Sequence, residues 1–205
     1  CHERDWVPDQ EQIFGRGVQF DWNEIYKILE SYFDNSLPRL TQVFLADYNG
    51  KLTYNMNPLY KLIHEHFAIQ NIAPIQNERL IQYSCTLPND QKYDSKLNLG
   101  KIILLKLLEK YKVKNLISSN KQGFSVNTSK LWNSYGKKIF LHYFDKSRLV
   151  EDQIINLDWV QRYVSKNNLD VRYINKFLGI LALEIWYRLF ITKDLKSNEK
   201  LQFLH

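Results

Sequence analysis

The sequence is poor in the residues that sheets and disulfide-linked scaffolds need. Its 205 residues include only seven glycines, five prolines and two cysteines. So few glycines and prolines argue against a sheet protein with many tight turns. The two cysteines provide neither a disulfide framework nor a paired-cysteine metal site, which favours a reduced, cytoplasmic protein.

Long hydrophobic runs are also missing. The longest candidate, residues 177–191, is interrupted by Glu184 and Arg188, so no segment stays apolar over the length that a membrane span requires. The sequence shows no secretory signal peptide, internal repeat or low-complexity segment. Because the chain starts with Cys1 rather than methionine, we expect that it has been processed or lacks its beginning. No membrane partner is expected.

A formal charge of +6 raises the question of nucleic-acid binding. The basic residues are spread among acidic ones instead of massed on one segment, and the sequence contains no recognised nucleic-acid-binding motif. The pattern is more typical of a solvated surface, with room for a site that binds anions such as nucleotide phosphates. A basic nucleic-acid module is therefore the last of the functions to consider, and no nucleic-acid partner is expected.

Apolar residues recur at helical spacing along most of the chain, which predicts a mainly α-helical fold. The sequence divides into an irregular segment over residues 1–20, a helical region over 21–194 and a polar tail over 195–205. Residues 97–113 carry apolar side chains on more than one face, so we expect this helix to be deeply buried. The predicted helices cover residues 21–33, 36–49, 57–67, 78–83, 97–113, 128–144, 156–164 and 170–190.

Lys121 is the strongest single candidate for a functional residue. It belongs to Asn120-Lys121-Gln122-Gly123-Phe124, which joins two predicted helices. Glycine lets the backbone turn sharply and phenylalanine anchors the loop in the core, so the loop can place the lysine ammonium at the mouth of a cleft. The alternative is a solvated lysine in an ordinary turn between helices.

Several short motifs occur in a fixed order around this loop. Downstream of it come Leu131-Trp132, Ser147-Arg148-Leu149-Val150, Leu157-Asp158-Trp159-Val160 and Leu183-Glu184-Ile185-Trp186-Tyr187-Arg188-Leu189-Phe190. Upstream of it lie Glu11-Gln12-Ile13-Phe14-Gly15, Pro74-Ile75-Gln76-Asn77-Glu78-Arg79-Leu80-Ile81 and Thr86-Leu87-Pro88. In this order and at this spacing, residues 11–190 resemble the C-terminal part of the synthetase domain of the glutamine-dependent asparagine synthetases.

The resemblance implies a fold, an activity and a set of ligands. The fold is the helical C-terminal portion of an adenine nucleotide α-hydrolase-like (PP-loop) α/β synthetase domain. The activity is ATP- and Mg²⁺-dependent activation of the aspartate side chain as an acyl adenylate, followed by displacement of AMP by ammonia. Lys121 would be the catalytic cation, and Glu11, Gly15 and Gly123 would lie at the nucleotide. No residue is assigned as a metal ligand.

The implied small-molecule partners are aspartate and ATP. The chain contains neither the Ser-Gly-Gly-x-Asp-Ser nucleotide loop of the family nor the N-terminus of its glutaminase domain. Upstream synthetase or glutaminase segments, or another subunit, would therefore have to supply them. A homodimer is a further arrangement that the sequence leaves open.

The chain departs from the family pattern where charged groups would act. The departures are Gln12, Lys61, Gln70, Ile72 and Asn77. They leave two alternatives to an asparagine synthetase open. One is a non-catalytic paralogue that acts as a binding or scaffold protein, and the other is an ATP-dependent ligase for a different acceptor, as in the similar β-lactam synthetases.

Overall fold

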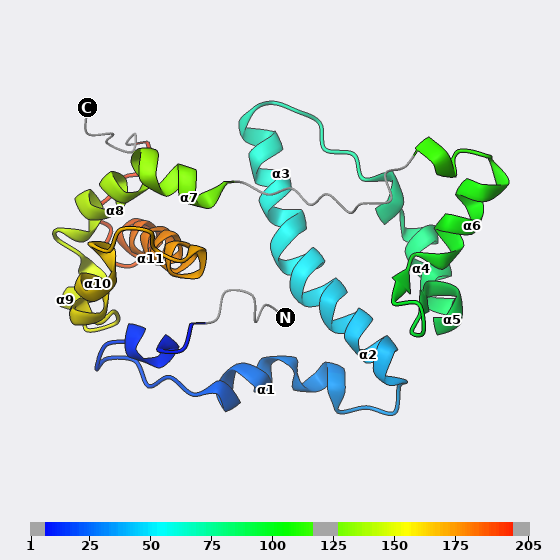
Figure 1. Ribbon diagram of the computed structural model, residues 1–205, viewed down its shortest axis with the longest axis horizontal. Helices are drawn as coiled ribbons and strands as arrows, with labels where there is room; N and C mark the ends of the chain where they lie inside the picture. The colour runs from blue at the N-terminus through cyan, green and yellow to red at the C-terminus, as the bar shows by residue number, and fades with distance from the viewer. Residues whose placement is uncertain (1–6, 117–126, 199–205) are drawn as a thin grey trace. The chain divides into compact units, whose positions relative to one another are not determined.

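The computed structural model describes residues 7–116 and 127–198 of the chain, and most of them lie in helices (Figure 1). The expectation of a mainly helical protein is therefore confirmed. The chain divides into two compact units, which we call the terminal unit, residues 1–21 together with 123–205, and the central unit, residues 22–122.

The terminal unit combines a short N-terminal segment with the C-terminal helices. Its elements are η2 (Gln10–Ile13), α7 (Thr128–Leu131), η6 (Trp132–Gly136), α8 (Lys137–Phe144), α9 (Arg148–Glu151), α10 (Leu157–Val164) and α11 (Val171–Phe190). The three helices predicted for this unit are confirmed, with one π-helical turn, η6, inside the first. Asn127, Asn156 and Asp170 begin them by accepting a backbone N–H with their side chains, as good N-caps do.

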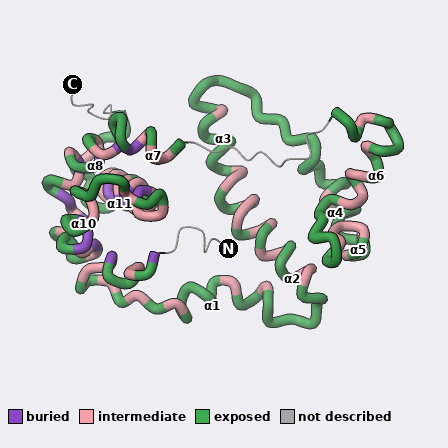
Figure 2. Tube along the Cα trace, in the orientation of Figure 1, coloured by how far each residue is buried: buried purple, intermediate pink, exposed green. Residues whose placement is uncertain are grey.

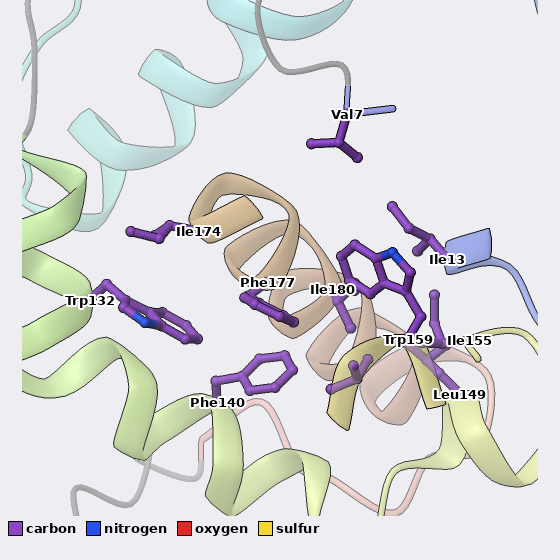
Figure 3. Close-up of a cluster of buried hydrophobic side chains, with 11 residues drawn as sticks. Val7, Ile13, Trp132, Phe140, Leu149, Ile155, Trp159, Ile174, Phe177 and Ile180 are labelled. Carbon is purple, nitrogen blue, oxygen red and sulfur yellow. The ribbon is translucent and has the colours of Figure 1, made fainter. Parts of the chain in front are cut away.

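Helix α11 is the centre of the terminal unit and packs against α7, α8 and α9. Its buried face presents Phe177 and Ile180 to a core in which most of the buried residues gather, among those that the structure describes (Figure 2). The Phe177 ring stacks on Trp132 with the centroids 5.3 Å apart, and Trp159 lies 5.5 Å from the same ring (Figure 3). These two tryptophans are core residues, as their helical spacing among apolar residues indicates.

Asp9 ties the N-terminal segment to this core. Its carboxylate accepts a hydrogen bond from the indole Nε1 of Trp159 at 2.9 Å and from the Tyr173 hydroxyl at 3.0 Å. Burial by itself raises the pKa of Asp9, but hydrogen bonds from Tyr163, Tyr173 and Trp159 lower it by more, so the pKa lies below its ordinary value of 3.8. Burial also raises the pKa of the Tyr173 hydroxyl, which keeps it protonated as a donor.

Because folding lowers the pKa of Asp9, the carboxylate stabilises the folded state fully above its unfolded pKa and loses that contribution as the pH falls through the folded pKa. We expect Asp9→Asn to lower the free energy of unfolding at neutral pH by about 1 kcal/mol. The variant should also lose less stability than the wild type below about pH 4. Urea titrations across this pH range measure both effects, and equal pH dependence of the two proteins would contradict the assignment.

The central unit is a series of helices with one short hairpin. Its elements are α1 (Trp22–Phe33), α2 (Arg39–Ala46), η3 (Asp47–Met56), α3 (Asn57–His66), η4 (Pro74–Gln76), α4 (Glu78–Thr86), α5 (Asn89–Lys92), β1 (Tyr93–Asp94), β2 (Leu99–Gly100), α6 (Ile102–Lys110) and η5 (Lys114–Leu116). Gln42 is the one buried residue within the described part of this unit, residues 22–116. Among the helices that the structure describes, none has the length and apolarity to cross a membrane.

The helix predicted over residues 36–49 has different ends. It begins at Arg39, and α2, η3 and α3 then follow one another without a break to His66, so the predicted stop at Asn49-Gly50 is wrong. A glycine typically ends a helix by adopting a left-handed conformation, but none of the described glycines has a positive φ. Asn49 instead donates its side-chain amide to the Leu45 carbonyl at 3.1 Å, inside the continuing helix.

The helix predicted over residues 97–113 is shorter than expected, and the expectation of deep burial is wrong. Only Ile102–Lys110 is α-helical, and no residue of this helix, α6, is buried. Residues 93–100 form a hairpin in which β1 and β2 pair antiparallel. The Asp94 carboxylate accepts two backbone N–H groups of the turn, at 2.9 and 3.0 Å, and so turns the chain back before α6 begins.

Candidate functional site

The residues predicted to act at a nucleotide fall into two groups. Lys121 and Gly123 lie outside the described residues, so their roles stay predictions. Glu11 and Gly15 lie in the N-terminal segment of the terminal unit, where Glu11 is exposed on η2 and Gly15 is half-buried just after it.

Residues 13–17 pair with the chain that follows α9. We call these residues the 13–17 segment. Gly15 and Gly17 donate their backbone N–H groups to the carbonyls of Ile154 and Gln153, at 2.9 and 2.8 Å. An antiparallel β-bridge between the two segments completes the pairing. The motif Glu11-Gln12-Ile13-Phe14-Gly15 is therefore held in position by the chain that follows α9.

Gly15 has no room for a side chain because of this pairing. A Cβ atom at Gly15 would lie 2.2 Å from the backbone oxygen of Gln153, far inside van der Waals contact. The close backbone approach that glycine allows is therefore made to another part of the same chain. The pairing with Gln153 is by itself a sufficient reason for glycine at position 15. A role of Gly15 at a nucleotide stays a prediction.

Two residues that depart from the family pattern have structural partners. The side-chain oxygen of Gln12 accepts a hydrogen bond from the Arg162 guanidinium at 3.0 Å, which joins η2 to α10. Asn77 caps α4, because its side chain accepts the backbone N–H of Arg79 at 3.0 Å. The amides at these positions therefore serve the fold.

A cavity of about 260 Å³ lies between η2 and α11 in the terminal unit. Its lining is mostly apolar and consists of Gln10, Ile13, Phe14, Ile155, Asn175, Lys176, Gly179, Ile180 and Leu183. The side-chain oxygen of Gln10 is buried and has no hydrogen-bond partner among the described residues. Neither Glu11 nor Gly15 lines this cavity, so the structure does not bring these two predicted residues together in it.

A larger cavity of about 580 Å³ lies in the central unit, between α3 and the chain that leads to α4. Its lining consists of Asn57, Tyr60, Lys61, His64, Glu65, Ile69, Gln70, Asn71, Ala73 and Gln76. We call it the central cavity. Its size is typical of sites for small molecules, and its lining is rich in amides and charged groups.

Polar contacts shape the walls of the central cavity. Asn57 and Gln76 exchange side-chain hydrogen bonds at 2.8 and 3.2 Å. Lys61 Nζ lies 3.8 Å from Glu65 Oε1, and both side chains are more than half exposed, so this ion pair contributes little and the ammonium is free to turn to a ligand. The Nδ1 atom of His64 is buried without a hydrogen-bond partner in the part of the chain that the structure describes.

The family model described as asparagine synthase matches residues 8–188. The chain belongs to the asparagine synthase family. No curated protein and no solved structure matches the chain. The family assignment made from the order of the motifs is thus confirmed, whereas the roles of single residues stay predictions.

Two departures from the asparagine synthase pattern line the same cavity. Lys61 reaches the central cavity from α3, and Gln70 reaches it from the loop that follows. Sequence spacing identified each departure but gave no sign that the two share a site. The available signal was the run of amides between residues 70 and 77, directly after an amphipathic helix.

The described residues contain no metal centre built from several protein ligands. Within residues 7–116 and 127–198, no group of three or more histidine, cysteine, aspartate or glutamate side chains could hold a metal ion. Mg²⁺ in nucleotide sites is typically held by one or two carboxylates and by substrate phosphates. Such a site needs fewer protein ligands than a group of three side chains, so binding of Mg²⁺ with ATP stays a prediction.

Proposed function

We propose that the chain is the helical C-terminal part of the PP-loop synthetase domain of an asparagine-synthase-type amide ligase. The enzyme activates the side-chain carboxylate of aspartate with ATP and forms the amide with ammonia. The match to the family model over residues 8–188 carries the proposal. The polar central cavity supports it, because it offers a place of suitable size for the acceptor.

The proposed reaction has two steps. An oxygen of the aspartate side-chain carboxylate attacks the α-phosphorus of ATP, so that a new O–P bond forms and the bond to pyrophosphate breaks. Ammonia then attacks the acyl carbon of the adenylate, and a C–N bond forms. The acyl C–O bond breaks, AMP leaves with the electron pair, and the nitrogen loses one proton to give the neutral amide.

The central cavity has the chemistry of a site for a small acidic amino acid. The Lys61 ammonium can pair with a carboxylate of the ligand in place of its long contact to Glu65. Glu65 is then available for the ligand's α-ammonium group. The side-chain amides of Gln70 and Asn71 can donate hydrogen bonds to the remaining carboxylate oxygens.

Lys121 is the catalytic residue of the proposal. By resemblance to the family, its ammonium stabilises charge on the leaving phosphates or on the amide-forming intermediate. Glu11, Gly15 and Gly123 would border the nucleotide. Because the Ser-Gly-Gly-x-Asp-Ser loop is absent from this sequence, another segment or subunit would cradle the phosphates.

Release of AMP and pyrophosphate tests the proposal. The longest natural form of the protein is incubated with Mg²⁺-ATP, aspartate and ammonium, and both products should depend on aspartate and equal the amide formed. Lys121→Ala is expected to lower kcat about 10²- to 10³-fold, because it removes a cation that acts on developing charge. Lys61→Ala is expected to raise KM for aspartate about tenfold with little change in kcat.

Lys106→Ala is the matched control for the Lys61 variant. Lys106 is an exposed lysine of the same unit and does not line the central cavity, so its loss should leave both constants unchanged. Equal KM values for the Lys61 and Lys106 variants would exclude the central cavity as the acceptor site.

A non-catalytic paralogue that binds partners is the second candidate. It is favoured by the structural contacts of Gly15 and Gln12, which occupy a segment that the resemblance assigns to the nucleotide. This candidate predicts no binding of Mg²⁺-ATP and no AMP release with any acid. A ligase for another acceptor would instead release AMP only when the correct acid replaces aspartate.

A further inference from the structure

Glu184 is a carboxylate in the core of the terminal unit that the proposed chemistry does not use. It lies in the C-terminal part of α11 and is 1% exposed. It accepts hydrogen bonds from the Ser147 hydroxyl at 2.6 Å and from the backbone N–H groups of Arg148 and Leu149 at 2.9 and 3.2 Å. These three donors come from the start of α9, so the carboxylate holds α9 in one position against α11.

Arg188 balances the charge of Glu184 from the next turn of α11. Its Nε donates to Glu184 Oε1 at 2.6 Å. Its Nη2 donates to the backbone carbonyl of Tyr143, in the last turn of α8, and to that of Lys146, just after the end of this helix. The pair therefore joins the end of α8, the start of α9 and α11 at one point.

The chain after α9 connects this helix to the 13–17 segment through backbone hydrogen bonds. The Leu149 carbonyl accepts the N–H groups of Ile154 and Ile155, at 2.8 and 3.0 Å. Ile154 in turn accepts the N–H of Gly15, and Ile155 forms the antiparallel bridge with Phe14. A series of hydrogen bonds thus runs from Glu184 through α9 to the 13–17 segment.

A buried carboxylate contributes little to the free energy of unfolding by itself. Its desolvation opposes folding, and buried ion pairs can often be replaced by well-packed apolar residues without loss of stability. An apolar side chain, however, cannot accept hydrogen bonds from a hydroxyl, two backbone N–H groups and a guanidinium at once. Glu184 is therefore suited to fixing geometry.

We propose that Glu184 is the positioning residue of the 13–17 segment. Through its hydrogen bonds to α9, Glu184 sets the distance between the 13–17 segment and α11. Both of these elements line the cavity of about 260 Å³. The functional part of this inference rests on the proposed function, in which Glu11 and Gly15 border the nucleotide. Loss of the carboxylate loosens the segment and leaves the centre of α11 folded.

Amide hydrogen exchange, measured by NMR on the full chain, tests the geometric part without any assumption about activity. Glu184→Gln keeps the shape of the side chain but removes its charge. It should speed the exchange of the Gly15 and Gly17 amides at least about tenfold relative to that of Phe177 in the core of α11. Glu151→Gln, which removes the same charge from an exposed ion pair on α9, is the matched control and should leave this ratio unchanged.

The exchange ratio separates positioning from plain stabilisation. Acceleration of all three amides by the same factor, or no acceleration, would overturn the proposal. Calorimetry of Mg²⁺-ATP binding to the natural form gives the functional readout, and affinity should fall about tenfold in Glu184→Gln but not in Glu151→Gln. A changed ratio with unchanged affinity would overturn the functional part. A changed ratio in a protein whose wild type binds no Mg²⁺-ATP would support positioning and refute the proposed function.

Discussion

Replacing Gly15 with alanine is expected to lower the free energy of unfolding by about 3 kcal/mol. The added Cβ atom would lie 2.2 Å from the backbone oxygen of Gln153, and no side-chain movement can relieve a clash with backbone. The pairing would have to open, and the hydrogen bond from Gly15 to Ile154 would be lost. Urea unfolding followed by tryptophan fluorescence measures the change, since Trp159 is buried in the adjoining core.

Gly179→Ala is the matched control in the same unit. Gly179 lies inside α11, and a Cβ atom there would meet nothing within 4 Å beyond its own helix backbone. Alanine should raise the free energy of unfolding by about 0.5 to 1 kcal/mol, the usual gain in a helix interior. A Gly15→Ala variant as stable as the wild type would contradict the close approach of the two segments.

Replacing Arg188 with alanine is expected to lower the free energy of unfolding by about 3 to 5 kcal/mol. The change leaves the Glu184 carboxylate, which is 1% exposed, without its cation. It also removes the donor to the carbonyls of Tyr143 and Lys146. An unpaired buried charge is among the most destabilising features that one substitution can create. The same urea titration measures this loss.

Two further variants show whether the unpaired charge is the cause. Replacing Glu184 with glutamine and Arg188 with methionine removes the charge together with its partner and keeps an acceptor oxygen for the α9 donors, so the double variant should recover part of the stability lost in Arg188→Ala. Arg148→Ala removes an exposed arginine from its pairs with Glu151 and Asp194 and should change stability little. A double variant less stable than Arg188→Ala would contradict the role given to the charge.

Periodicity predicted the helices of the terminal unit well because their apolar faces meet a real core there. The segment 170–190 places Phe177 and Ile180 on the buried side of α11, as its spacing indicates. The same reasoning failed for residues 97–113, since apolar residues around a helix show what it could bury and not whether another element covers it. The Asp94 turn, a local hydrogen-bond effect, then shortened the helix further.

The candidate site was less predictable, because its contacts join residues far apart in the sequence. Glycine at position 15 indicated a close backbone approach, but the sequence could not show that the backbone approached is that of Gln153. Glu184 entered the sequence argument as part of a motif, whereas its burial and its hold on α9 depend on the folded core. Likewise, the shared position of Lys61 and Gln70 at the central cavity follows from how the loop after α3 folds back.

The central claim is that this member of the asparagine synthase family forms an acyl adenylate. Transfer of labelled oxygen tests it most directly. Aspartate carrying ¹⁸O in its side-chain carboxylate is incubated with Mg²⁺-ATP, ammonium and the longest natural form of the protein. The attacking carboxylate oxygen stays on phosphorus when the acyl C–O bond breaks. Mass spectrometry should therefore find one labelled oxygen in AMP. AMP without the label, or label in inorganic phosphate, would contradict the account.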